Sequence, residues 1–122
     1  MQALNLYILT RSRKEFCTEY ENVLACRNHV LKMREHEYET MVSLVEWLYE
    51  NGADIIDFEG FYFSYVIEYI GKEFDLLKIS QGNIVLNIEL KSNFVNEEKK
   101  KKQLIRNQYY LKHLAPNIRL FT

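Results

Sequence analysis

Three observations predict an α/β fold with a mixed four-stranded sheet flanked by helices, in the order αβββαβ. Apolar residues recur at helical spacing over residues 36–50. Three runs rich in aromatic and β-branched residues follow, separated by turns so short that they join antiparallel neighbours. A last helix then leads to a strand, which such a crossover normally makes parallel to its neighbour. We expect residues 1–35 to form an N-terminal helical extension of a core at 36–122, within a single compact domain.

The composition fits one soluble domain. The chain has 122 residues, of which 48% are apolar and 27% are charged, as in ordinary globular proteins. Its net charge of −1 does not by itself indicate a nucleic-acid-binding protein. Cys17 and Cys26 form no zinc-binding pattern and are expected to be free thiols. Without a secretory signal or an apolar run long enough to cross a membrane, we expect a cytoplasmic protein.

Most of the sequence before residue 52 is predicted to be helical. The apolar run at residues 4–9 fits either a strand or the lead-in to a helix, and Ser12 with Glu15 fits a capping box. A helix is predicted from His36 to Glu50 and ends at Asn51-Gly52, because glycine is common just past a helix C-terminus.

The remaining elements alternate with turn residues. The predicted strands are residues 58–70, 73–79, 84–91 and 118–122. Turns are predicted at Gly71-Lys72 and at residues 80–83. Residues 97–114 form a predicted helix with acids at its start and with Lys112 and His113 near its end, which suits the helix dipole.

The third predicted strand places two charged residues side by side. Its alternation gives one face of apolar residues, expected to be the core side, and a second face with Glu89 and Lys91. The expected core-side residues are Ile84, Leu86, Ile88 and Leu90. On the preceding strand, Asp75 stands among apolar residues, where an acid is costly to bury without a partner.

The turn between these strands brings the two acids to one level of the sheet. A turn centred between Gly82 and Asn83 pairs Glu89 with Leu76, one residue from Asp75. Two carboxylates this close repel unless a cation lies between them. Oxygen ligands with few histidines favour Mg²⁺, with Mn²⁺ as an alternative, over zinc.

An Asp, a gap of 13 residues and then Glu-Leu-Lys, in this order of elements, resembles the PD-(D/E)xK nuclease superfamily with its restriction-endonuclease-like core. The resemblance covers residues 37–122 and implies Mg²⁺-dependent hydrolysis of DNA phosphodiester bonds. It implies that Asp75 and Glu89 are metal ligands and that Lys91 is the catalytic lysine. Phe74 stands where many members have a proline before the Asp.

The same resemblance implies two supporting residues. Members often contribute a Glu from the first core helix, for which Glu37 fits better than Glu39 or Glu46 as a metal ligand. They also often carry a catalytic Gln on the helix after the third strand, and Gln103 fits slightly better than Gln108. Residues 101–114 resemble nuclease domains at the start of bacterial ATPase or helicase-like proteins, so such a domain is an expected partner.

Several alternatives stay open at this stage. Glu89 and Lys91 can be an ordinary exposed pair, and the fold can serve a non-cleaving nucleic-acid-binding or assembly module, or a small interaction domain. The lysine run is either a solvated helix face or a surface that binds the DNA backbone. Its members are Lys99, Lys100, Lys101 and Lys102. Because the chain stops after its last predicted strand, we expect a domain of a longer protein or one that needs a partner chain, and a homodimer stays open.

Overall fold

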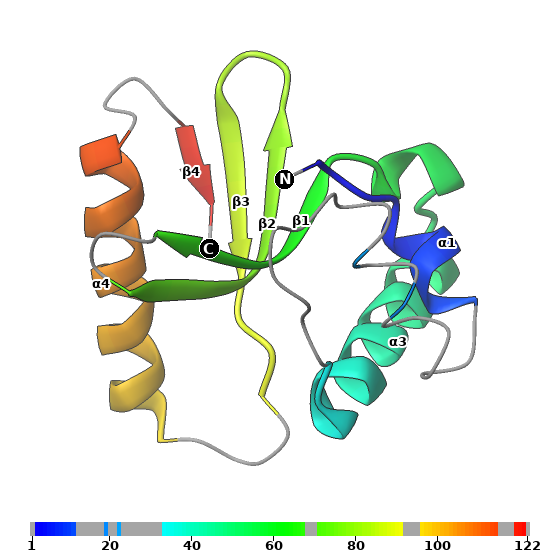
Figure 1. Ribbon diagram of the computed structural model, residues 1–122, viewed down its shortest axis with the longest axis horizontal. Helices are drawn as coiled ribbons and strands as arrows, with labels where there is room; N and C mark the ends of the chain where they lie inside the picture. The colour runs from blue at the N-terminus through cyan, green and yellow to red at the C-terminus, as the bar shows by residue number, and fades with distance from the viewer. Residues whose placement is uncertain are drawn as a thin grey trace. The chain divides into compact units, whose positions relative to one another are not determined.

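The computed structural model (Figure 1) describes residues 2–11, 19, 22, 33–67, 71–91, 96–114 and 119–121. The chain forms two compact units, Met1–Tyr62 and Phe63–Thr122. Both helices and strands are present, which confirms the predicted mixed α/β class.

In the first unit, the main helix is α3, Glu35–Glu50. It begins one residue before the predicted start and ends where the sequence predicts, at Asn51, whose Nδ2 donates a hydrogen bond to the Trp47 carbonyl at 2.8 Å. Gly52 follows with a φ of +98°, a conformation that glycine adopts without steric cost. The buried face of α3 consists of Met41, Val45 and Glu37.

The N-terminal apolar run combines the two conformations that its sequence left open. Leu4 forms an antiparallel bridge with Phe61. Asn5 then caps the short helix α1, Leu6–Thr10, by accepting a hydrogen bond from the Ile8 N–H at 3.2 Å. Residue 4 therefore pairs as a single β-bridge while residues 6–10 are helical.

A short 3₁₀ helix, η1 (Ile55–Phe58), corrects the predicted start of the first strand. Phe58 belongs to η1, and Gly60 with a φ of +83° separates it from the strand, which therefore begins at Phe61. Phe58, Phe61 and Phe63 are buried.

The sheet has the strand order β1-β2-β3-β4, and all of it except the first two residues of β1 belongs to the second unit. Its strands are β1 (Phe61–Ile67), β2 (Lys72–Ser80), β3 (Ile84–Ile88) and β4 (Arg119–Phe121). Strands β2 and β3 are antiparallel, whereas β4 is parallel to β3. The connection between these parallel strands contains the helix α4, Glu97–Leu114, which runs beside the sheet (Figure 1).

The turn between β2 and β3 is one residue shorter than predicted. Ser80 pairs with Ile84, so three residues form the turn. Gly82 and Asn83 both have positive φ angles, 79° and 61°. A three-residue hairpin loop contains a residue in this left-handed conformation. The centre of the hairpin therefore lies at Gly82, and every cross-strand pair shifts by one residue from the predicted register.

The structure also corrects the predicted extent and core side of β3. The strand ends at Ile88 rather than at Lys91, and two residues later the Leu90 N–H donates to the side chain of Asp75 on β2. Val85 and Asn87 are buried at 6% and 1% exposure, on the face that was expected to be polar. The expected core-side residues other than Leu90 are only half-buried. The prediction was wrong because α4, which bonds to Glu89 on that face, covers it.

Helix α4 has the boundaries and end charges that the sequence predicts. Asn96 caps it, because its Oδ1 accepts a hydrogen bond from the Glu98 N–H at 2.8 Å. Asn107 and Leu111 are its buried residues in the described part of the chain. They lie four positions apart and so share one side of the helix.

Other predictions fall outside the described residues. They concern the capping box at Ser12 and Glu15 and the thiols of Cys17 and Cys26. Within the residues that the structure describes, no helix is both long and apolar enough to cross a bilayer.

Candidate functional site

The β2–β3 register places Asp75 opposite Glu89. The last ladder pair is Leu76 with Ile88, and one further step along the same register pairs Asp75 with Glu89. Residues directly opposite each other in an antiparallel pair point to the same face. The predicted register would have put the two acids on opposite faces, so the three-residue turn is what brings them together.

Asp75 is half-buried and is held by the backbone of the neighbouring chain segment. Its Oδ2 accepts a hydrogen bond from the Leu90 N–H at 2.8 Å. This bond fixes the Asp75 carboxylate against the peptide that follows Glu89. The two carboxyl groups are therefore kept at one level just past the end of β3.

Glu89 is held on both of its oxygens by α4. Gln103 Nε2 donates to Oε2 at 2.9 Å, and Asn107 Nδ2 donates to Oε1 at 2.6 Å. The side chain of Glu89 is only 8% exposed. Because Gln103 and Asn107 lie one turn apart on the same side of α4, the helix presents two amide donors to a single carboxylate.

Lys91 lies beside Glu89, and its side chain is partly exposed to solvent. Its Nζ lies 3.9 Å from Glu89 Oε2, and its side chain is 34% exposed. At this distance the pair is a loose ion pair rather than a hydrogen bond. The ammonium group is therefore close enough to act on the carboxylates and still accessible to a ligand from solvent.

The surroundings of Glu89 disfavour its ionised form. Burial raises the pKa of Glu89 to about 7, and the charge of Asp75 and a hydrogen bond with Asp75 act in the same direction. Lys91 and Lys72 lower this pKa and only partly offset the other causes. A proton shared by the acids relieves their repulsion, and a bound cation would relieve it in the same way.

The two carboxylates suit a hard divalent cation that takes most of its ligands from water and substrate rather than from the protein. In the described part of the chain, no group of three or more His, Cys, Asp or Glu residues could hold a metal ion. Asp75 and Glu89 provide two carboxylates. Mg²⁺ commonly binds through one or two carboxylates and completes its octahedron with water and substrate phosphate, so the pair suits Mg²⁺ better than zinc.

The structure brings together four of the predicted site residues, which are Asp75, Glu89, Lys91 and Gln103. Glu37 belongs to the other unit, where its Oε2 accepts a hydrogen bond from the Arg34 N–H at 3.0 Å. Its role as a metal ligand stays a prediction.

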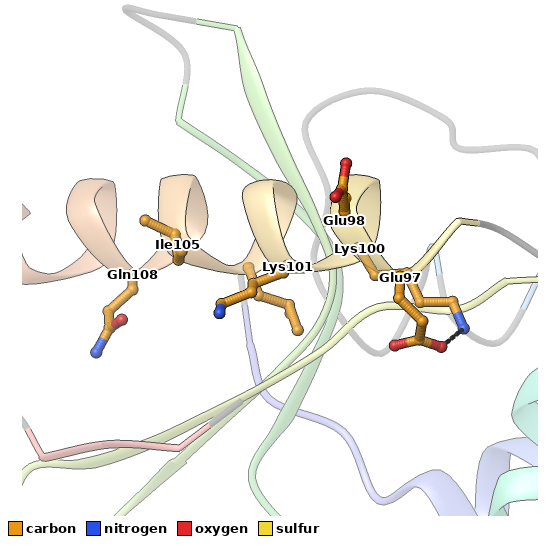
Figure 2. A pocket seen from close by; sticks show the side chains of 7 residues that line it. Glu97, Glu98, Lys100, Lys101, Ile105 and Gln108 are labelled. Carbon is orange, nitrogen blue, oxygen red and sulfur yellow. Dashed lines mark hydrogen bonds and ion pairs between the residues drawn. The ribbon is translucent and has the colours of Figure 1, made fainter.

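Gln108, the alternative to Gln103, lies away from the acid pair. It lines a hollow of about 500 Å³ along α4, together with Glu97, Lys101 and other residues of the helix. Figure 2 shows Lys101 and Gln108 projecting from the same side of α4. None of Asp75, Glu89 and Lys91 lines this hollow.

The predicted DNA-binding lysines differ in their surroundings. Lys99, Lys101 and Lys102 are exposed, whereas Lys100 is half-buried and lies 3.2 Å from Glu97 Oε1, an ion pair drawn in Figure 2. Three ammonium groups of the run are thus directed to solvent near the start of α4.

Two residues near the acids were not predicted. Asn107 was not among the expected site residues, although its spacing of four from Gln103 was a usable signal. Lys72 affects Glu89 from the start of β2, and no pattern in the sequence indicated it.

Comparisons with protein-family models, curated protein sequences and solved structures give no match to this chain. A functional conclusion therefore depends on the geometry of the acid pair and its surroundings.

Proposed function

We propose that this chain is a cytoplasmic Mg²⁺-dependent deoxyribonuclease module with a restriction-endonuclease-like core of the PD-(D/E)xK type. The observation that carries the proposal is the placement of Asp75 opposite Glu89 on one sheet face, with Lys91 beside them. Two acids and a lysine at the end of neighbouring strands suit the hydrolysis of a phosphodiester bond.

In this proposal, Asp75 and Glu89 hold the cation. A bound Mg²⁺ lowers the pKa of a water ligand and withdraws charge from a phosphoryl oxygen. The raised pKa of Glu89 supports the assignment, because a carboxyl group that resists ionisation beside another acid gains most from a cation. Gln103 keeps the Glu89 carboxylate oriented through its hydrogen bond.

Lys91 acts on the substrate rather than on the fold. Its partly exposed ammonium group is in position to orient the attacking water or to stabilise the charge that develops on the phosphoryl oxygens. Because its ion pair with Glu89 is loose, it can approach a phosphate without breaking a buried interaction.

The lysines at the start of α4 extend the proposal to the DNA backbone. Lys99, Lys101 and Lys102 are exposed on the helix that also supplies Gln103. Each phosphate contact contributes to the salt dependence of binding. Replacing all three with Gln is expected to make the slope of log Kd against log salt shallower by about 2 to 3.

The decisive experiment compares three proteins in one cleavage assay. Plasmid and single-stranded DNA are incubated with Mg²⁺ or Mn²⁺ and with wild type, Lys91→Ala or Lys112→Ala. Lys112 is an exposed lysine in the last turn of α4 and controls for the loss of one positive charge. We expect Lys91→Ala to lower cleavage by about 10²-fold or more, with Lys112→Ala close to wild type.

Equal cleavage by wild type and Lys91→Ala, or no cleavage with either metal, would contradict the catalytic proposal. DNA binding that weakens with salt but is not followed by cleavage would favour the non-cleaving module. Absence of salt-dependent binding would favour the small interaction domain.

A further inference from the structure

We propose that Asn107 is a positioning residue that fixes the orientation of Glu89 for metal binding. The inference rests on the proposed function, because it assigns Glu89 as a ligand. Asn107 Nδ2 donates to Glu89 Oε1 at 2.6 Å, while Gln103 holds the other oxygen. With one donor on each oxygen, the carboxylate cannot turn about its last torsion without losing a hydrogen bond.

The two donors differ in how rigidly they are held. Asn107 is 0% exposed, whereas Gln103 is half-buried. The side chain of Asn is also one methylene shorter than that of Gln, so it has fewer rotamers. Asn107 is therefore the more firmly fixed of the two amides. Its hydrogen bond determines the orientation of the Glu89 carboxylate plane, in which the remaining lone pairs lie.

The surroundings of Asn107 argue against a purely structural role. Among the residues that the structure describes, its Oδ1 finds no hydrogen-bond partner although it is buried. An unpaired buried amide oxygen destabilises a fold. An apolar side chain of similar shape would avoid that cost, so the contact with Glu89 is what the amide contributes.

Asn87 provides a matched control. It is 1% exposed and lies on the same face of β3 as Glu89, two positions earlier. Neither atom of its amide has a hydrogen-bond partner within the described part of the chain. It thus shares residue type and burial with Asn107 but lacks the contact with the carboxylate.

The test measures Mn²⁺ affinity by titration calorimetry and unfolding temperature for the full chain carrying Asn107→Leu or Asn87→Leu. We expect Asn87→Leu to keep or raise the unfolding temperature, and Asn107→Leu to lower it slightly because Glu89 Oε1 loses its donor. Asn107→Leu should raise the Kd for Mn²⁺ by about 10- to 100-fold, as removal of such supporting hydrogen bonds does, whereas Asn87→Leu should leave it unchanged. An unchanged Kd in Asn107→Leu, or the same increase in both variants, overturns the proposal. Asn107→Ala replaces Asn107→Leu if the larger side chain prevents folding.

A second measurement separates this inference from the proposed function. In the ¹⁵N-correlated spectrum, the Asn107 side-chain amide is assigned by its loss in Asn107→Leu and is then compared between wild type and Glu89→Gln. We expect the Asn107 protons to move strongly when the carboxylate is replaced. If wild type binds no Mn²⁺ but this shift is seen, the metal proposal fails and Asn107 still holds Glu89. If the resonance does not move, the positioning role is excluded whatever the metal result.

Discussion

Two glutamates, Glu37 and Glu89, are almost equally buried and yet lie in opposite electrostatic surroundings. Their side chains are 11% and 8% exposed. Glu37, at the start of α3, faces the Arg34 guanidinium at 3.4 Å and accepts the Arg34 N–H. Glu89 faces another acid, Asp75, and two neutral amides.

The difference shows that burial alone does not mark a functional carboxylate. The charge of Glu37 is compensated by Arg34, the residue that precedes its helix, and by the positive end of the helix dipole. The charge of Glu89 is compensated only loosely by Lys91, at 3.9 Å. A buried acid without a close cation from its own chain is therefore the better candidate to recruit one from solution.

The largest expected effect concerns Glu89 itself. Glu89→Gln keeps the shape and removes the charge, so the proposed metal site loses a ligand. We expect DNA cleavage with Mg²⁺ to fall by about 10³-fold or more, while the free energy of unfolding at pH 8 stays the same or increases, because the repulsion from Asp75 is gone. Plasmid cleavage rates and urea denaturation measure the two effects. A variant as active as wild type would remove Glu89 from the site.

The second-largest expected effect is a change in the free energy of unfolding with pH. The pKa of Glu89 is raised from 4.5 to about 7 in the folded state, so between these values the folded protein binds more protons than the unfolded chain. Stability must then fall as the pH rises through this range. Allowing for solvent screening, we expect a loss of about 1–2 kcal/mol between pH 5 and pH 8 without metal.

Glu89→Gln is the control for this pH effect, because Gln does not titrate. Chemical denaturation at several pH values should give a flatter profile for the variant. Identical slopes for wild type and variant would show that another group is responsible.

Metal addition should reverse this loss of stability at high pH. A cation that binds only the folded state stabilises it by about 1.4 kcal/mol at ten times its Kd. We expect Mg²⁺ to raise the unfolding temperature at pH 8 and to have much less effect at pH 5, where Glu89 is protonated. Scanning calorimetry with Mg²⁺ and with EDTA tests this expectation, and Glu89→Gln should show no gain at either pH.

The sequence predicted the elements better than their contacts. The helices α3 and α4 follow from apolar spacing and from the residues at their ends, which are local signals. The parallel β4 follows from the general rule for crossover connections. The register of Asp75 against Glu89 did not follow, because it depends on whether the hairpin turn contains three residues or four. Backbone φ angles at Gly82 and Asn83 decide this, and the composition of the turn fits both lengths.

The buried face of β3 was mispredicted for a similar reason. Alternation identifies two faces of a strand, but it does not say which one a later helix will cover. Helix α4 covers the face of Asn87 and Glu89 despite their polarity. Asn107 was overlooked because its importance lies in a contact with a residue 18 positions earlier.

The smallest expected effect belongs to Glu37 and completes the comparison. Glu37→Ala removes the acceptor of the Arg34 N–H at the start of α3, so we expect the free energy of unfolding to fall by about 1 kcal/mol. Glu39→Ala, two positions along the same helix and exposed, controls for the loss of an acid and should change stability by less than about 0.5 kcal/mol. If Glu37 serves only the helix, the loss is the same with and without Mg²⁺ and the Kd for Mn²⁺ is unchanged. A Kd that rises as much as in Glu89→Gln would instead place Glu37 among the metal ligands, as the family resemblance implies, and would show that neutralisation by a neighbouring arginine does not exclude a catalytic role.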